Sequence, residues 1–287
     1  MLRQANPNQT RLGAIAFVNT LPIDFRFTPG PDILRRYEAP AVLNALIRAG
    51  QLDVSPVSSL CYLREKHRLY LLPGVSVSSF GAVESVLFLT RFDLDSADFA
   101  AMPHIYVPDD SETSIGLLSL LLREKTGDDA SARFTSYPAA QAADILATWD
   151  NALIIGDRAL YVQEQREQGG YGDFQAIDLS LWWRRQTGLP FVFAVWAARK
   201  DWAATHPDVL ADIQQRLCDS RDGSFHNPEL FQALLQAARD KSGLSPATLE
   251  RYYRHCLDYQ FDDAHRQALT RFEAAMGLSV EEHTHVS

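Results

Sequence analysis

The stretch Gly188–Trp196, G-L-P-F-V-F-A-V-W, constrains the fold more than any other part of the chain. After Pro190 it runs through aromatic and β-branched residues without a polar break. A strand with one solvent face alternates apolar and polar residues, whereas a strand covered on both faces need not. Pro190 is compatible with a strand because it stands at its start. Phe191–Trp196 is therefore predicted to be a central strand of a covered sheet.

A second apolar stretch, Val83–Thr90, follows the small and polar loop Ser76–Gly81. The long segment between the two stretches has its own alternation of strands and helices, which is typical of a separate α/β unit. We therefore predict two α/β lobes, with these stretches carrying the chain out of lobe one and back. Lobe one would comprise residues 1–91 and 196–287, and lobe two residues 92–195.

Composition excludes several classes of protein. A net charge of −9 over 287 residues argues against nucleic acid or an anionic membrane as the main partner. No apolar run is long enough to span a bilayer. The three cysteines show no C-x-x-C pairing, which favours a reducing compartment. The first residues are polar and contain no apolar signal core, so we expect a cytoplasmic protein.

The remaining pattern alternates short apolar runs with amphipathic segments, which indicates mainly parallel sheets. Further strands are predicted over Leu12–Phe17, Ile33–Tyr37, Leu52–Val57, Tyr70–Val77, His104–Val107, Arg133–Tyr137 and Ala152–Ile155. Helices are predicted from Pro40 to Ala49, from a Ser58-Ser59 cap to Lys66, from a Ser111 cap to Gly127, and over Ala139–Thr148. From Asp201 the chain is helical, and these helices are expected to pack on lobe one.

Five short polar tips follow predicted strands: Asn19-Thr20, Ser58-Ser59, Ser79 to Ser85, Ser111 to Ser114, and Gly156-Asp157. Ligands of parallel α/β sheets bind at the carboxyl ends of the strands, and here also in an interlobe cleft. Two tips stand at predicted helix starts, where free N–H groups attract anions without a formal charge. Such residues can also be simple helix caps. Together the five tips predict a small-molecule site between the lobes.

Other candidates for chemistry are weaker. The sequence contains no P-loop, G-x-G-x-x-G, H-E-x-x-H or G-x-S-x-G motif, and we expect neither a metal nor a cofactor. His283 and His285 stand in a polar tail, and Trp182-Trp183 is better explained by packing than by a ligand. Asp157 follows a buried strand and is an acid–base or orienting candidate, with a loop cap as the equal alternative.

The chain resembles the chorismate dehydratases of the futalosine route to menaquinone. The resemblance covers about Arg11 to Lys200 and rests on blocks that occur in order along the chain: Phe17–Pro22, Leu52–Leu63, Gly81–Val86, Ser111–Ser114, Ile154–Leu160 and Thr187–Trp196. It implies a two-lobed fold like that of type 2 periplasmic binding proteins, with a two-strand hinge and an interlobe cleft. It also implies a cofactor-free lyase that converts chorismate to 3-[(1-carboxyvinyl)oxy]benzoate and water.

Under this resemblance the active-site asparagine and serine of the family fall on Asn19 and Ser85. Two neighbours depart from the family pattern, Ala82 where proline is usual and Thr20 where serine is common. Asn19 and Ser85 are neutral, so we expect them to donate and accept hydrogen bonds rather than to act as bases. Asp157, Glu84 or a carboxylate of the substrate would take the proton.

Substrate binding is assigned to further residues of the same tips. Ser58, Ser59, Thr113 and Ser114 are expected to hold the two substrate carboxylates, from helix-start chemistry. Thr20, Ser111 and Gly156 complete the predicted binding set. The expected partner is chorismate alone, without nucleic acid or membrane, for a monomer or homodimer.

Three other functions fit the same architecture. One is the 1,4-dihydroxy-6-naphthoate synthase of the same pathway, which is expected to use a histidine base in the lobe-two cleft, yet the tips Ser111–Ser114 and Gly156-Asp157 carry none. Another is a non-catalytic solute-binding protein for a small carboxylate, which would need an export signal. The third, a ligand-sensing module, would carry a basic helix-turn-helix, and none precedes Arg11. The enzyme is preferred.

Overall fold

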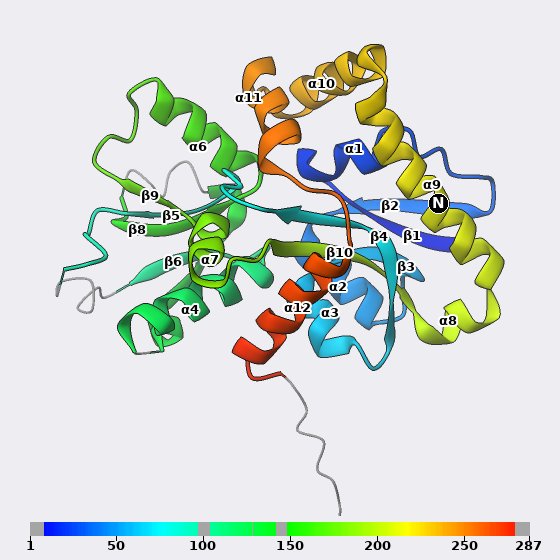
Figure 1. The fold of residues 1–287 in the computed structure, drawn as a ribbon, viewed down its shortest axis with the longest axis horizontal. Coiled ribbons are helices and arrows are strands. Elements are labelled where there is room, and N and C mark those ends of the chain that lie inside the picture. Colours follow the sequence, from blue (N-terminus) through cyan, green and yellow to red (C-terminus); the bar gives the residue numbers. More distant parts are fainter. Residues whose placement is uncertain (1–8, 97–103, 128, 142–147, 279–287) are drawn as a thin grey trace, which may run out of the picture.

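The computed structural model describes residues 9–96, 104–127, 129–141 and 148–278. Within these ranges the strands form two five-stranded sheets, one in each half of the molecule (Figure 1). In sheet one the order is β2 (Ile33–Glu38), β1 (Thr10–Ile15), β3 (Val54–Ser58), β10 (Phe191–Arg199) and β4 (Leu69–Ser79). In sheet two it is β7 (Phe134–Tyr137), β6 (Ile105–Pro108), β8 (Asn151–Ile155), β5 (Val86–Thr90) and β9 (Gln175–Asp178).

The strand β10 is the central strand that the sequence predicts. It pairs with β3 on one side and with β4 on the other, and most of its side chains are buried. Helices cover both faces of its sheet, which is why its residues need no polar alternation. Phe191 also packs edge-on against Trp183 and Phe272, so apolar groups from three parts of the chain meet here.

The expectation of mainly parallel sheets describes four of the five strands in each sheet and was wrong for the remaining one. In sheet one β10 runs antiparallel to both neighbours, and in sheet two β5 does the same. The other strand pairs are parallel. The two exceptions are the strands that bring the chain in from the other half, so each starts at the edge of the sheet where the other strands end.

The placement of Val83–Thr90 in the first half was also wrong. The strand begins only at Val86, and it pairs with β8 and β9 of sheet two. The chain therefore crosses between Ser79 and Val86, and it returns through the segment from Asp178 to Phe191. The division into two lobes stays a prediction, and we propose these crossing segments as its boundaries.

The helices include most of the predicted ones, close to their expected ranges, and three that were not predicted, which begin at Leu21, Asp157 and Leu179. They are α1 (Leu21–Asp24), α2 (Pro40–Arg48), α3 (Ser59–Glu65), α4 (Thr113–Thr126), α6 (Asp157–Glu167), α7 (Leu179–Thr187), α8 (Lys200–Thr205), α9 (Pro207–His226), α10 (Pro228–Ser242), α11 (Pro246–Arg251) and α12 (Asp263–Ala275). Short 3₁₀ turns cover Val18–Thr20, Ala130–Arg133 and Ala139–Gln141, and a π-helical turn covers Tyr252–Cys256. The predicted helix from Ala139 begins as one of these turns, and residues 142–147 lie outside the described ranges.

Two predicted helix caps have different outcomes. Ser58 is the N-cap of α3, since its Oγ accepts a hydrogen bond from the Cys61 N–H at 3.3 Å. The N-cap of α4 is Glu112 and not Ser111, because the helix starts at Thr113. Ser111 lies one position before this cap, and its Oγ still accepts a hydrogen bond from Ser114 N at 3.4 Å.

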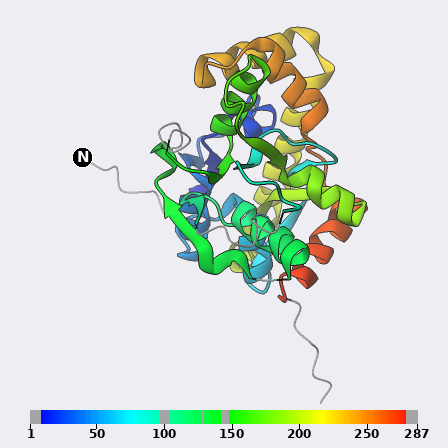
Figure 2. The same cartoon turned by 90° about the vertical axis from the view of Figure 1, so that its left-hand side faces the viewer.

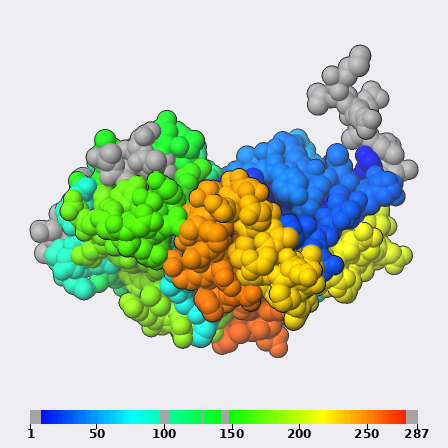
Figure 3. Space-filling view, turned by 90° about the horizontal axis from the view of Figure 1, so that it is seen from above, coloured from blue at the N-terminus to red at the C-terminus, as the bar shows by residue number. Residues whose placement is uncertain are grey.

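The C-terminal helices α9 and α12 contact sheet one, and α11 also reaches the other half. Ser245 N and Thr248 Oγ1 donate to Glu164 Oε1 on α6 at 3.1 and 2.7 Å. Figures 1 and 2 show α11 (orange) and α12 (red) on opposite sides of the molecule, and Figure 3 shows α11 between the green and blue halves. No helix of the described ranges is long and apolar enough to cross a membrane.

Candidate functional site

A cavity of about 70 Å³ lies between the two halves, where parallel strands of both sheets end. Apolar side chains such as Phe17, Val83 and Phe193 form part of its wall. Seven of the ten predicted site residues also line it: Asn19, Ser58, Ser85, Ser111, Thr113, Ser114 and Gly156. Most of these residues stand at or after the carboxyl ends of strands, which converge here. Ser85 instead directly precedes β5, whose antiparallel direction places its start at the same edge.

The other three predicted residues support loops beside the cavity and do not line it. Thr20 is fully buried, and its Oγ1 donates to Asp24 Oδ2 at 3.2 Å. Ser59 Oγ donates to the Val192 carbonyl at 2.6 Å. Asp157 Oδ1 accepts a hydrogen bond from the Val18 N–H at 3.1 Å. The Asp157 side chain therefore has the geometry of the loop cap that the sequence offered as the alternative.

Ser85 is held from several directions. Its carbonyl accepts a hydrogen bond from Gly156 N at 2.8 Å, and its Oγ accepts one from the Tyr252 hydroxyl at 2.9 Å. The preceding residue, Glu84, has a φ of 57°, and its N–H donates to Asp178 Oδ2 at 2.7 Å. Burial raises the pKa of Asp178 to about 6. Because Tyr252 fills an acceptor position of Ser85, the Ser85 proton is free to be donated into the cavity.

Asn19 lies in the 3₁₀ turn Val18–Thr20 and presents an unsatisfied amide to the cavity. Its Oδ1 is buried and has no hydrogen-bond partner among the described residues. Both backbone groups of Val18 are held, the N–H by Asp157 and the carbonyl by the Tyr253 hydroxyl at 3.0 Å. Burial raises the pKa of Asp157, against the opposing effects of the Val18 N–H, Lys241 and Arg158. An unpaired buried amide oxygen favours a ligand that supplies a donor.

The hydroxyl groups of Ser58, before α3, and of Thr113, at the start of α4, accept hydrogen bonds from N–H groups of the protein. Ser58 Oγ accepts hydrogen bonds from Asn44 Nδ2 at 3.0 Å and from Cys61 N. Thr113 Oγ1, which belongs to the other half, accepts one from Leu60 N at 2.9 Å. A hydroxyl that accepts retains its own proton, so these caps can still donate to a carboxylate in the cavity. The capping and ligand-binding interpretations are compatible here.

Two carboxylates in the cavity wall were missed from the sequence. Asp110 Oδ1 is buried without a partner among the described residues, and Arg158 Nη1 lies 3.5 Å from Oδ2. Burial raises the pKa of Asp110. Glu112 accepts two hydrogen bonds from Arg48, at 2.8 and 2.9 Å. Both residues flank Ser111 in D-D-S-E-T-S, so the signal was their position in a tip already chosen for its hydroxyls.

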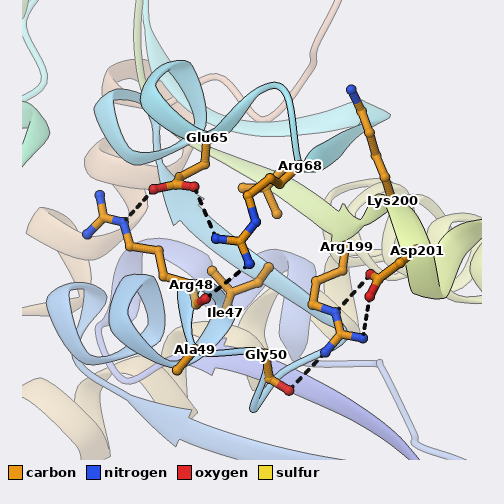
Figure 4. A pocket seen from close by; sticks show the side chains of 10 residues that line it. Ile47, Arg48, Ala49, Gly50, Glu65, Arg68, Arg199, Lys200 and Asp201 are labelled. Carbon is orange, nitrogen blue, oxygen red and sulfur yellow. Dashed lines mark hydrogen bonds and ion pairs between the residues drawn. The ribbon is translucent and has the colours of Figure 1, made fainter.

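A larger hollow of about 400 Å³ lies on another face and contains none of the predicted residues (Figure 4). Its four cations point to partners within the protein. Arg48 and Arg68 are directed at Glu65, Arg199 at Asp201 and the Gly50 carbonyl, and Lys200 Nζ donates to the Lys66 carbonyl. The smaller cavity, with its unsatisfied polar atoms, is therefore the candidate site. The described ranges contain no group of three or more His, Cys, Asp or Glu side chains that could hold a metal ion.

Sequence comparison identifies the family. The profile of the family described as "Menaquinone biosynthesis" matches residues 10–277. The chain belongs to this menaquinone biosynthesis family. Among its relatives is a chorismate dehydratase of Thermus thermophilus, which is 32% identical over 281 residues, covering 93% of this chain and 95% of the relative.

Comparison with solved structures confirms the periplasmic-binding-protein-like α/β fold of this family member. Protein AF1704 of Archaeoglobus fulgidus has a TM-score of 0.69 at 16% identity, covering 96% of this chain and 100% of that one. The Candida albicans protein CA3427, described as having the generic periplasmic binding protein fold, has a TM-score of 0.65 at 11% identity, with 95% and 91% covered. The alkanesulfonate-binding protein SsuA of Xanthomonas axonopodis has a TM-score of 0.61 at 17% identity, with 96% and 95% covered.

Proposed function

We propose that this protein is a chorismate dehydratase, a hydro-lyase that converts chorismate to 3-[(1-carboxyvinyl)oxy]benzoate and water. The observation that carries the proposal is the similarity to the Thermus enzyme, which covers nearly all of both chains. The cavity supports it, because Asn19 and Ser85 line the same space from opposite halves of the molecule. A cytoplasmic location and a monomeric or homodimeric state stay predictions.

The reaction is a 1,2-elimination that makes an aromatic ring. The C3–H and C4–O bonds break, a C3–C4 double bond forms, and the proton and hydroxide leave as water. Ser85 has a proton to donate, and we assign it to the departing C4 hydroxyl or to a substrate carboxylate. The unpaired Asn19 Oδ1 accepts a hydrogen bond from a substrate hydroxyl and fixes the orientation of the ring.

The C3 proton needs an acceptor, and the contacts reduce the choice. Asp157 binds the Val18 N–H, and Glu84 forms an ion pair with Arg251 at 3.0 Å, so neither of these sequence candidates is directed at the cavity. Of the three proton acceptors that the sequence suggested, only a carboxylate of the substrate itself remains. The structure adds Asp110, whose Oδ1 has no partner among the described residues.

Binding requires the two halves to separate. Ligand pockets for molecules of drug size commonly measure about 300–1,000 Å³, whereas this cavity measures about 70 Å³. The hydrogen bond between Leu60 N and Thr113 Oγ1 crosses between the halves and would break on opening. We infer a hinged opening that admits the substrate, followed by closure that excludes water.

A proton NMR time course of the purified protein with chorismate tests the function. New aromatic signals together with a retained enolpyruvyl methylene pair are expected. Ser85→Ala should lose most of the turnover, whereas Ser136→Ala, an exposed serine on β7, should keep it. Unchanged chorismate with a raised melting temperature would instead support a solute-binding protein. No change in either would contradict chorismate as the ligand.

A further inference from the structure

The π-helical turn Tyr252–Cys256 contacts both loops that carry the proposed catalytic residues. It follows α11 directly, and the Leu257 N–H donates to the Tyr252 carbonyl, five residues back. π-Helical turns are rare in proteins, and those that occur are often found at functional sites. From its residues alone, this part of the chain is expected only to pack as a helix.

The two tyrosines of the turn hold different loops. The Tyr252 hydroxyl donates to Ser85 Oγ at 2.9 Å. The Tyr253 hydroxyl donates to the carbonyl of Val18, the residue before Asn19, at 3.0 Å. Consecutive residues of a helical turn point in different directions around its axis, so neighbouring tyrosines can reach two loops on different sides of the turn. Both are almost fully buried, at 1% and 2% exposure, so water does not compete for these hydrogen bonds.

The contact with the Ser85 loop is reinforced by the preceding residue. Arg251 Nη2 lies 3.0 Å from Glu84 Oε2, so residues 251 and 252 bind residues 84 and 85 in parallel. Glu84 has a φ of 57°, a conformation that non-glycine residues rarely adopt. The surroundings must hold such a conformation in place. Arg251 supplies one of these restraints, and the Asp178 carboxylate supplies another.

We infer that Tyr252 and Tyr253 are positioning residues for the dehydration, which fix Ser85 and Asn19 at the distance that the substrate needs. The inference rests on the proposed function and extends it to the C-terminal quarter of the chain. Tyr252 acts through Ser85: by donating to Oγ it directs the serine proton away from the protein and toward the cavity. Tyr253 acts through the backbone of Val18, which sets where the Asn19 amide lies.

A double-mutant cycle tests the inference. Tyr252→Phe removes only the hydroxyl and is expected to lower kcat for chorismate about tenfold, with KM changed less than twofold. In a Ser85→Ala background the same substitution should change kcat less than twofold, since no serine proton remains to be directed. Tyr253→Phe should show the same coupling with Asn19→Ala.

Tyr259→Phe is the matched control. Tyr259 is also buried, and its hydroxyl has no hydrogen-bond partner among the described residues, so its removal should leave kcat unchanged. Equal losses from Tyr252→Phe in the wild-type and Ser85→Ala backgrounds would show a merely structural role and overturn the inference. If Tyr252→Phe does not fold, the Tyr253 and Asn19 cycle decides. An inert wild-type protein is a different result, which overturns the proposed function and this inference with it.

Discussion

The ion pair between Arg48 and Glu112 should hold the cavity closed, and this can be measured. Arg48 ends α2, which packs on sheet one, and Glu112 precedes α4 in the other half. Two parallel hydrogen bonds of 2.8 and 2.9 Å join them, and Asn44 Nδ2 adds a third at 3.1 Å. Burial alone would raise the pKa of Glu112, but the hydrogen bond from Arg48 and its charge lower it. The carboxylate is therefore charged at neutral pH.

The magnitude follows from burial and geometry. The two side chains are 31% and 22% exposed, so the pair lies between a surface ion pair, worth about 0–1 kcal/mol, and a buried one, whose disruption costs about 3–5 kcal/mol. Glu112→Gln should destabilise the closed form by about 1–2 kcal/mol, which is a factor of about 5–30 in population. The KM for chorismate should rise by about that factor with little change in kcat, because the competent form becomes scarcer.

The matched control is Glu38→Gln, which removes the same charge from the more exposed Arg36–Glu38 pair within β2. Its KM should equal that of the wild type. Small-angle scattering without ligand should show a larger radius of gyration for Glu112→Gln only. If Glu112 acts mainly by repelling an anionic substrate, Glu112→Gln lowers KM and leaves the scattering unchanged, and the closure argument fails.

Three further predictions concern two residues of the cavity wall and one that supports the Ser85 loop. Gly156 has a φ of 65°, and a Cβ at this position would lie 3.4 Å from the Phe17 ring. Gly156→Ala should therefore destabilise the protein by about 1–3 kcal/mol in thermal unfolding. An unchanged melting temperature would contradict this. Asp178 has a pKa raised from 3.8 to about 6, so the folded state binds its proton more tightly and stability from this group falls as pH rises through that window. Urea unfolding at pH 4 and 7 should show a smaller fall in Asp178→Asn than in the wild type, while Asp24, whose pKa is also raised to about 6, contributes in both proteins. Asp110→Asn should lower kcat at least about a hundredfold if Asp110 accepts the C3 proton, and less than tenfold if the substrate carboxylate does.

The local sequence was sufficient to predict those elements whose own residues show how they are buried or capped. The strand β10 is an unbroken apolar run, and α3 begins at a serine cap, so both were predicted within a few residues. The edge strand β9, Q-A-I-D, was missed because nothing in its four residues favours a strand; it forms by pairing with β5. The helix α6 was missed because polar residues dominate it and the apolar face is narrow.

The candidate site divides in the same way. Ser85 joins the site because the antiparallel strand β5 starts at this edge. Asn19 and Gly156 follow strands and could be grouped from the sequence, because parallel topology brings those strand ends together. Their supporting contacts could not. Tyr252 and Ser85 are 167 positions apart, and a tyrosine in a helical segment gives no local sign of the loop that it will contact. The direction of the two crossing strands was missed for a related reason, since it depends on which half the chain enters from.

Charge explains why closure and binding should be linked in this acidic protein. The wall of the cavity carries Asp110 and Glu112, which would repel a substrate with two carboxylates. Arg158 lies beside Asp110 within the same half, but the bidentate partner of Glu112, Arg48, comes from the other half. On the proposed closure, Glu112 gains that partner only as the halves meet, at the moment when hydroxyl donors from both halves surround the ligand. Closing therefore forms the cavity and neutralises its wall in one step, so the doubly charged substrate is bound most tightly in the form that excludes water.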